Sequence, residues 1–338
     1  MSGTVTLREL KSQPDAWDTL IARLQSGALS LPIDPADFDE FTLLGSGTSY
    51  YLALAVADWM RRRGLNARAV PSCEAMLDPY ETRASDKRRL AIGFSRSGYS
   101  SELILASKQL RDAGFTTMGI SCSDGSDLLT QTDHPILISE GFEDGLVMLR
   151  SFSSMLIAAQ WFFGSAADRD ALATLPDKGR ALLTLESGLT DLANARAFNR
   201  FVFLGSGPFY PLTLEGALKI QEMAIATSEA YHSLDYRHGP KACADDDTLI
   251  VLFTLPDLDH GRALARDIKA LGATLVVIGA DADKYDNIAD MAIATDIEDA
   301  AAGAAAALLP VQMFAYATAL RRDQNPDAPV NLAKVVTF

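Results

Sequence analysis

The chain repeats its own sequence plan, and this repeat restricts the folds that it can adopt. Residues 41–64 read as an apolar run, a Gly/Ser turn and a helix, and residues 200–223 follow the same plan. Residues 90–121 and 249–280 form a second matched pair, each with an apolar run, a polar turn, an amphipathic helix and a further apolar run. Such alternation predicts βαβ units, and continuous apolar runs are typical of strands buried on both faces. Two copies predict two parallel α/β domains in tandem.

Domain boundaries follow from the repeat. The polar, Gly/Pro-punctuated stretch at 164–180 is the expected link, and one helix is expected near Asp15–Leu24. We therefore expect four segments: a helical lead-in (1–40), a first domain (41–165), a second domain (180–325) and a tail (326–338).

The amino-acid composition disfavours several classes of protein. The net charge of −14 disfavours a nucleic-acid partner, because duplex-binding proteins usually carry a basic patch. The three cysteines form no CxxC pair, so neither a disulfide framework nor a metal site is expected, and a cytoplasmic location fits. The first ten residues lack the apolar core of a signal peptide. The long apolar stretch Ala300–Leu320 is expected to be a buried helix and not a membrane span, since alanine dominates it and Gln312 interrupts it.

The stretch Phe94–Ser101, "FSRSGYSS", carries the strongest chemical signal of the first repeat. It follows a predicted strand and opens a helix, so hydroxyls from Ser95, Ser97 and Ser100 would join free N–H groups at a helix N-terminus. Gly98 would let a ligand approach the backbone. This combination fits a phosphate group, although a plain serine-capped helix fits the pattern equally well.

The other strand–helix junctions differ from this one. The matching loop of the second repeat, Phe253–Gly261, has two aspartates in place of the serines, which predicts one anion site per chain. The junction Gly45–Tyr51, "GSGTSYY", is not a full GxGxxG motif, so a dinucleotide site is disfavoured. Its Ser46, Thr48 and Ser49 could contact a polyhydroxyl ligand or could simply cap a tight turn.

Three charged residues share one face of the predicted helix that follows Gly205. Glu215, Lys219 and Glu222 stand at positions i, i+4 and i+7. Spacing alone favours a solvent-exposed stripe, but neighbouring apolar residues leave only a narrow polar strip. The helix also begins at the carboxyl end of a strand, where α/β folds bind ligands.

Two further residues are candidates because of their positions. His238 precedes Gly239-Pro240, a sharp turn, and a histidine held there can act as an acid or base near neutral pH. Lys334 precedes an apolar, strand-like end of the chain. Taken singly, each is more typical of a surface residue, as we expect for His134, His232 and His260.

Taken together, these segments resemble the sugar isomerase (SIS) family, notably the isomerase half of glutamine–fructose-6-phosphate aminotransferase. The resemblance covers almost the whole chain, and its segments occur in the family's order and spacing: "LRELKSQP", "GSGTS", "SRSGYS", "LEGALKIQE", "EAYHSLDYRHGP", "LPVQMFAY" and "NPDAPVNLAKVVTF". It implies two tandem SIS domains, each a flavodoxin-like αβα sandwich around a parallel sheet.

The resemblance also implies roles for individual residues. Glu222 would move a proton between C1 and C2 of a sugar, and His238, donated by the neighbouring subunit of a homodimer, would open the sugar ring. Lys219 would contact the open-chain sugar, with Lys334 and Glu215 in the same pocket. The phosphate and nearby hydroxyls would be bound by the two loops: Ser46, Gly47, Thr48, Ser49, Ser95, Arg96, Ser97, Gly98 and Ser100. No metal, cofactor, nucleic acid or membrane partner is implied, only a small phosphosugar.

Several positions depart from the family pattern. Ser2, not Cys, follows Met1, so glutamine-dependent transfer is not expected. Arg96, Tyr99 and Ser100 alter the usual "SxSGxT" loop, and Val330 replaces an arginine before "NLAK". Segment 145–155 is closer to sugar-amine deaminases. The expected function is a phosphosugar isomerase or amino-sugar-phosphate deaminase acting on a hexose- or hexosamine-6-phosphate. The alternatives are a non-catalytic sugar-phosphate sensor, a plain aldose–ketose isomerase and a fructosamine-phosphate deglycase.

Overall fold

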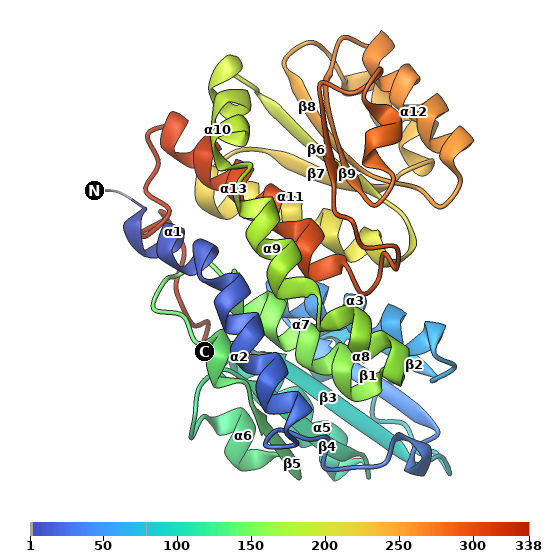
Figure 1. Ribbon diagram of the computed structural model, residues 1–338. Coiled ribbons are helices and arrows are strands. Elements are labelled where there is room, and N and C mark those ends of the chain that lie inside the picture. The colour runs from blue at the N-terminus through green and yellow to red at the C-terminus, as the bar shows by residue number, and fades with distance from the viewer. Residues whose placement is uncertain (1–2, 79, 338) are drawn as a thin grey trace. The chain divides into compact units, whose positions relative to one another are not determined.

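The computed structural model describes residues 3–78 and 80–337 and contains two parallel five-stranded sheets with flanking helices (Figure 1). The chain divides into two compact units. The first-repeat unit comprises Ser12–Pro176 with Ala333–Phe338, and the second-repeat unit comprises Met1–Lys11 with Asp177–Leu332. Residues 1 and 2 of the expected lead-in and Phe338 of the expected tail lie outside the described residues.

The sheet of the first-repeat unit has the strand order β2-β1-β3-β4-β5, with every pair of neighbours parallel. Its strands are β1 (Glu40–Gly45), β2 (Ala67–Pro71), β3 (Arg89–Ser95), β4 (Thr116–Ser121) and β5 (His134–Leu137). Central strand β3 is buried along its whole length, because helices cover both faces.

Helices on both faces of this sheet complete an αβα sandwich. Helices α4–α6 lie over a core that includes Leu44, Ala91 and Leu103. Helices α3 and α7 cover the opposite face, and α2 packs on α7, where the indole N–H of Trp17 donates to Ser153 Oγ at 2.9 Å. The helical segments of this unit are α2 (Gln13–Gln25), η1 (Pro35–Asp37), α3 (Thr48–Arg62), α4 (Ser72–Leu77), α5 (Ser101–Asp112), α6 (Asp127–Gln131), η2 (Ser139–Gly141), α7 (Arg150–Phe163) and α8 (Ala166–Leu172).

The sheet of the second-repeat unit has the order β10-β9-β8-β6-β7, again all parallel. Its strands are β6 (Arg200–Gly205), β7 (Ser228–His232), β8 (Thr248–Phe253), β9 (Thr274–Gly279) and β10 (Met291–Ala294). Read from the β7 edge, the strands follow the chain as second, first, third, fourth and fifth, as in the other unit. This is the flavodoxin-like order, and it confirms the predicted pair of parallel α/β domains.

Helix α12 covers one face of this sheet, with Leu264 and Ile268 packed against Val202 and Ile250. Helix α11 contacts the other face, and α13 packs beside α11 and α10. The helical segments are α1 (Thr4–Lys11), α9 (Leu175–Leu183), α10 (Glu186–Ala195), η3 (Gly207–Phe209), α11 (Tyr210–Ala224), η4 (Asp235–His238), η5 (Pro240–Cys243), α12 (Leu258–Ala270), η6 (Ala282–Tyr285) and α13 (Ala304–Arg321).

The stretch at 164–180, predicted as the polar link between the two domains, is mostly helical. Ser165 and Asp168 form a capping box that starts α8, and α9 follows directly. The polar composition was correctly identified, but here it reflects the exposed face and cap of short helices.

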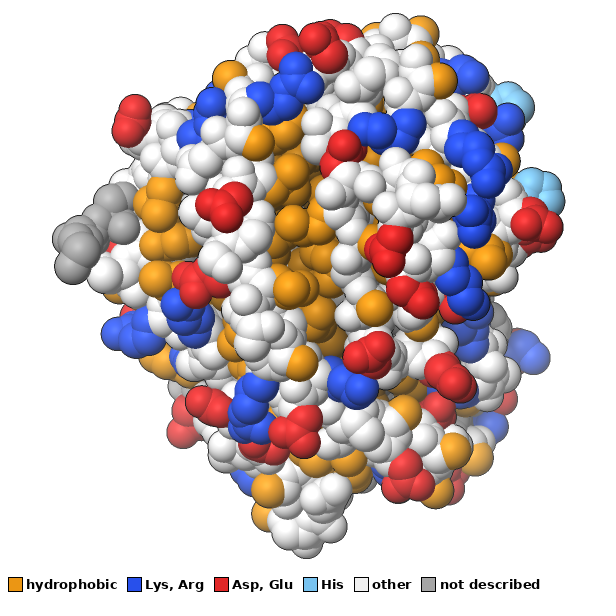
Figure 2. Space-filling view, turned by 45° about the horizontal axis from the view of Figure 1, so that its top comes forward, with side chains coloured by type: hydrophobic (Ala, Val, Ile, Leu, Met, Phe, Trp, Pro, Cys, Tyr) orange, Lys and Arg blue, Asp and Glu red, His pale blue; other side chains and the backbone are white. Residues whose placement is uncertain are grey.

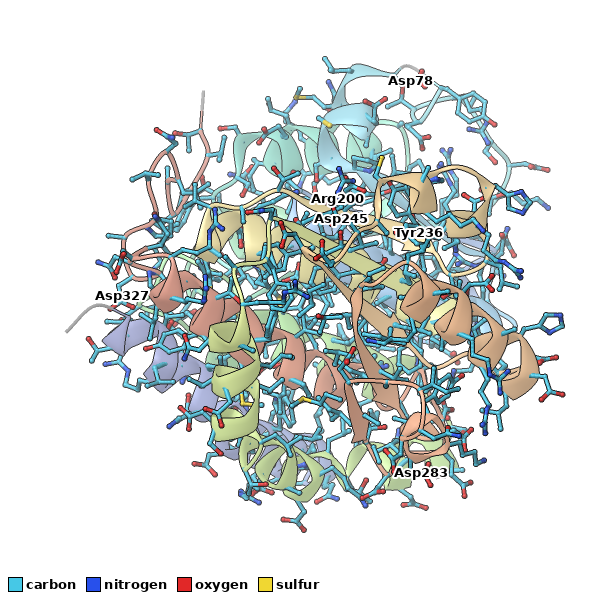
Figure 3. The ribbon with its side chains drawn as sticks, turned by 90° about the horizontal axis from the view of Figure 1, so that it is seen from above. Asp78, Arg200, Tyr236, Asp245, Asp283 and Asp327 are labelled. Carbon is cyan, nitrogen blue, oxygen red and sulfur yellow. The ribbon has the colours of Figure 1, made fainter. Side chains whose placement is uncertain are left out.

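The chain ends also differ from the predicted arrangement. Helix α1 was missed, and it is fixed within the second-repeat unit by Asp327 (Figure 3), whose carboxylate accepts from the N–H of Val5 at 3.1 Å and the N–H of Thr6 at 2.8 Å. The strand-like end predicted after Lys334 contains no strand in its described part, up to Thr337.

Helix α13 is buried, as predicted for the apolar stretch that contains it, and Gln312 is completely covered. In the described part of the chain, no helix combines the length and hydrophobicity that crossing a bilayer requires. Acidic side chains are scattered over the face in Figure 2, so the net negative charge is not gathered in one patch of that face.

Candidate active site

Two polar loops of the first-repeat unit leave neighbouring strands at the same edge of the sheet. The junction Ser46–Ser49 comprises the β1–α3 loop and the first two residues of α3, and the β3–α5 loop contains Arg96–Ser100. Strands β1 and β3 are parallel neighbours, with Leu43 opposite Ile92. Their carboxyl ends therefore bring the two loops together, at the edge where open α/β sheets bind ligands.

The β3–α5 loop is held open by its own hydrogen bonds. Ser95 Oγ accepts from the N–H of Gly98 at 2.9 Å, and Ser97 Oγ accepts from the N–H of Tyr99 at 3.3 Å. Gly98 has φ +72°, and a Cβ there would lie 2.1 Å from Ser126 Oγ. A glycine is therefore required for both conformation and space.

Ser100 occupies the N-cap position of α5, but within the described residues its side chain makes no capping hydrogen bond. The plain serine-capped turn, which the sequence left as an alternative, is therefore not what this loop forms. The Ser100 hydroxyl and the first amides of a three-turn helix remain suited to an anion. Phosphate binding by these serines stays a prediction.

The β1–α3 loop places small polar residues beside the first loop. Gly47 has φ +55° at the N-cap of α3, and Thr48 and Ser49 are buried directly after it, while Ser46 is exposed. Ser49 Oγ lies 3.8 Å from the sulfur of Met148, so this loop contacts the segment before α7.

Arg96 has partners that the sequence did not suggest. Its guanidinium donates to the carbonyls of Gly145 and Leu146 at 3.3 and 2.8 Å, and to the carbonyl of Lys334 at 3.0 Å. In the structure, Arg96 binds these main-chain carbonyls. Direct contact between Arg96 and a phosphate remains a prediction.

Lys334 lies in the same unit as the two loops, although it is far from them in the sequence. Its ammonium donates to the carbonyls of Glu143 and Asp144 at 2.8 and 3.0 Å. The Glu143 carboxylate is buried and accepts from the N–H and Oγ of Ser151 and from the N–H of Leu149. Sequence reasoning missed Glu143, because nothing in "FEDG" distinguishes a buried acid from a surface one.

Helix α11 belongs to the second-repeat unit, and its charged residues are not a solvated stripe. Glu215 and Lys219 are completely buried, and Glu222 is 20% exposed. Lys219 Nζ lies 3.2 Å from Glu215 and 2.5 Å from Glu222. The exposed stripe that spacing favoured is therefore wrong, because tertiary packing covers this face.

Packing also explains why α11 lies so close to its sheet. A Cβ on Gly216 would lie 2.8 Å from the ring of Phe203 on β6, so only glycine permits this approach. Burial lowers the pKa of Lys219, but the carboxylates of Glu215 and Glu222 outweigh it, and the net pKa is raised. Lys219 is therefore a stable ammonium between two carboxylates.

His238 ends η4 and is exposed, just before Gly239, whose φ of +141° forms the predicted sharp turn. Its proposed transfer to a neighbouring subunit stays a prediction. His232 is exposed, as expected, and its ring stacks on Tyr210 with ring centroids 3.7 Å apart.

In the second repeat, the N-terminus of the corresponding helix, α12, is capped by a side chain of the protein. Asp257 caps α12 by accepting from the N–H of His260 at 2.9 Å, and the carboxylate also lies 3.0 Å from His260 Nδ1. The amide donors that would attract an anion are thus already satisfied by an aspartate. This difference supports the expectation of one anion loop per chain. Among residues 3–78 and 80–337, no cluster of His, Cys, Asp and Glu is arranged to hold a metal ion.

Comparisons with known proteins agree with this architecture. The glutamine–fructose-6-phosphate aminotransferase of Pyrobaculum aerophilum is 28% identical over 98% of this chain and 57% of its own length. That of Neisseria meningitidis is 30% identical over 87% of this chain and 51% of its own length. The chain thus spans little more than half the length of these relatives.

Solved structures show the same fold. Glucosamine-6-phosphate deaminase from Thermotoga maritima superposes with a TM-score of 0.85 and 27% identity, covering 99% of this chain and 100% of its own. Tagatose-6-phosphate ketose/aldose isomerase from Escherichia coli gives a TM-score of 0.87 at 24% identity, over 96% of this chain and 95% of its own. The SIS domain family model matches residues 39–164 and 195–322, so this chain belongs to the SIS domain family and contains two SIS domains.

Proposed function

We propose that the chain is a phosphosugar isomerase or amino-sugar-phosphate deaminase that acts on a hexose- or hexosamine-6-phosphate. The observation that carries this proposal is the geometry of α11: a partly exposed carboxylate, Glu222, held by a buried ammonium, Lys219. A positioned carboxylate can move a proton between adjacent carbons, and a nearby cation stabilises the oxyanion that forms.

The reaction can be written from these groups. Glu222 removes a proton from one of the two carbons C1 and C2, which gives an enediol or an enolamine, and returns it to the other carbon. With a hydroxyl at C2 the result is aldose–ketose interconversion. With an amine at C2 the proton shift gives an imine at C2, which takes up water and releases ammonia. The raised pKa of Lys219 favours electrostatic stabilisation over attack by a free amine.

The hydroxyl-rich loops of the first-repeat unit support a 6-phosphate substrate. The N-terminus of α5 offers amide donors, and the Ser97 and Ser100 side chains lie beside them. A phosphate bound there would anchor the sugar and supply binding energy for the reaction at C1 and C2. We also propose a homodimer in which His238 assists ring opening in the partner's site.

The test is a panel of 6-phosphosugars and their unphosphorylated counterparts, assayed for isomerisation and for ammonia release. Turnover of glucosamine-6-phosphate with release of ammonia would support the deaminase, and turnover without ammonia would support the isomerase. Several phosphosugars that raise the melting temperature with none turned over would contradict catalysis and favour the sensor. Equal thermal shifts with unphosphorylated sugars would contradict the phosphate site.

A further inference from the structure

Arg96 is a buried cation at the start of the β3–α5 loop, between Ser95 at the end of β3 and Ser97. It is 7% exposed, and its side chain bonds to main-chain carbonyls of Gly145, Leu146 and Lys334. The nearest carboxylate, Glu143, lies 3.8 Å away, which is too long for a hydrogen bond. The hydrogen bonds of Arg96 therefore join the anion loop to two other segments, the turn at 143–146 and the C-terminal tail.

Lys334, a residue of the tail, also donates hydrogen bonds to the turn at residues 143–146. Its ammonium donates to the carbonyls of Glu143 and Asp144. Arg96 thus donates to the backbone of the tail and the turn, while the tail's own side chain donates to the turn. We call this arrangement the tail clamp, formed by Arg96, Lys334 and residues 143–146.

The turn at residues 143–146, to which both cations donate, is held in place by its own hydrogen bonds. The Glu143 carboxylate is 1% exposed and accepts from Leu149 N at 2.8 Å, Ser151 N at 3.1 Å and Ser151 Oγ at 2.6 Å. A buried, fully hydrogen-bonded carboxylate fixes the backbone around it. The solvent-exposed partner in the clamp is the tail, at residues 331–334.

The tail also reaches the helix that would receive the anion. The N–H of Ser101, the first residue of α5, donates to the carbonyl of Val336 at 3.4 Å. The tail thus accepts from the first amide of α5, and a ligand in the loop would accept from the amides next to it. The tail is therefore joined to the loop at two places, through the Arg96 side chain at Lys334 and through the Ser101 amide at Val336.

We infer that Arg96 is a positioning residue that latches the C-terminal tail to the anion loop and thereby sets the place of Lys334. Its removal leaves three carbonyls without their cationic donor and takes away the side-chain bond that holds the tail backbone at Lys334, so the remaining contacts of the tail are weakened. The consequence for turnover rests on the proposed function, whereas the latch itself concerns only the tail.

Hydrogen–deuterium exchange of the intact chain tests the latch without a substrate. In Arg96→Ala, the exchange of the Ser101 amide, which donates to the carbonyl of Val336 in the tail, should rise about tenfold or more, and Arg96→Lys should restore part of the protection. The control is Arg62→Gln, which removes an exposed arginine paired with Asp58 at 2.6 Å in the same unit. If Arg96→Ala does not fold, Lys334→Met opens the same clamp from the tail. Unchanged exchange of the Ser101 amide in the folded variants would overturn the inference.

Kinetics separate positioning from direct phosphate contact. Loss of the latch should lower kcat about tenfold or more while KM changes less than about threefold, and Arg96→Ala with Lys334→Met should be little worse than either alone. A raised KM at unchanged kcat would mean that Arg96 holds the phosphate, and it would overturn the positioning role. If the wild type turns over no phosphosugar, the proposed function fails, and the exchange result still decides the latch.

Discussion

Lys219 Nζ lies 2.5 Å from a carboxylate oxygen of Glu222, and the lysine side chain is completely buried. A buried ammonium in contact with a partly exposed carboxylate fixes the orientation of that carboxylate. The relationship makes Glu222 the residue whose replacement should most clearly separate chemistry from binding.

Glu222→Gln should lower kcat by about 10²–10⁴-fold, because the amide keeps the shape of the side chain and cannot take up a proton. The thermal shift caused by a phosphosugar should persist, since this change leaves the β1–α3 and β3–α5 loops intact. The matched control is Glu298→Gln, an exposed glutamate of the same unit, which should leave kcat unchanged. Equal activity of Glu222→Gln and wild type would remove Glu222 from the mechanism.

Lys219→Met should destabilise the second-repeat unit by about 3–5 kcal/mol, because Glu215 would be left as a buried charge without its ammonium. Adding Glu215→Gln should recover part of the loss, since the second change removes that charge. Chemical denaturation followed by circular dichroism measures both values. Additive losses in the double variant would show that the two residues do not act as a pair.

Gly98→Ala and Gly47→Ala form a matched pair in the two loops. Both positions have φ between +20° and +160°, so both changes strain the backbone, by about 1 kcal/mol each. Only the Gly98 change also meets a neighbour at 2.1 Å, while a Cβ on Gly47 meets nothing within 4 Å among the described residues. Gly98→Ala should therefore cost about 1–3 kcal/mol more in unfolding free energy. Equal losses would mean that Ser126 moves away without cost.

Asp168→Asn should destabilise the first-repeat unit at neutral pH by about 1–2 kcal/mol. The Arg63 guanidinium and hydrogen bonds from Ser165 outweigh burial and hold the pKa of Asp168 at about 2, below its ordinary 3.8. A lowered pKa stabilises the fold above pH 3.8, and this contribution is lost as the pH falls towards 2. The difference between variant and wild type should therefore shrink over that range in urea denaturation. Asp170→Asn, an exposed neighbour on α8, is the control, and a difference that is constant with pH would contradict the assignment.

Mixing inactive subunits tests the proposed transfer of His238. If each site combines Glu222 of one subunit with His238 of its partner, refolding Glu222→Gln together with His238→Ala restores one complete site in each mixed dimer. Activity should then reach roughly a quarter of the wild-type value. Sedimentation measures the dimer independently. No recovery in proven mixed dimers would place both residues in one subunit's site or exclude one of them.

Much of the fold could be predicted from sequence, because parallel strands buried on both faces leave uninterrupted apolar runs such as β3 and β8. Both repeats and the burial of α13 followed from patterning. Helix α1 could not be found in this way, since its position depends on hydrogen bonds to Asp327, more than three hundred residues away in the sequence.

The candidate site was predicted less completely, for a physical reason. Spacing placed Glu215, Lys219 and Glu222 on one face, but burial of that face depends on packing that spacing does not encode. The contacts of Arg96 with residues 145, 146 and 334 likewise join segments that no local pattern connects. The clearest local signals were those set by backbone conformation, such as the glycine at position 98.

The assignment of Ala333–Phe338 to the first-repeat unit has a consequence for the order of folding. During synthesis the ribosome completes Ser12–Pro176 first, then the entire second-repeat unit up to Leu332, and only afterwards the segment with Lys334. Domains generally fold as they emerge, so the first sandwich should form with its turn at 143–146 not yet clamped. A nascent chain halted before Ala333 would thus carry both sandwiches and still lack the bonds from Lys334 to the carbonyls of Glu143 and Asp144, which form only after both sheets are complete.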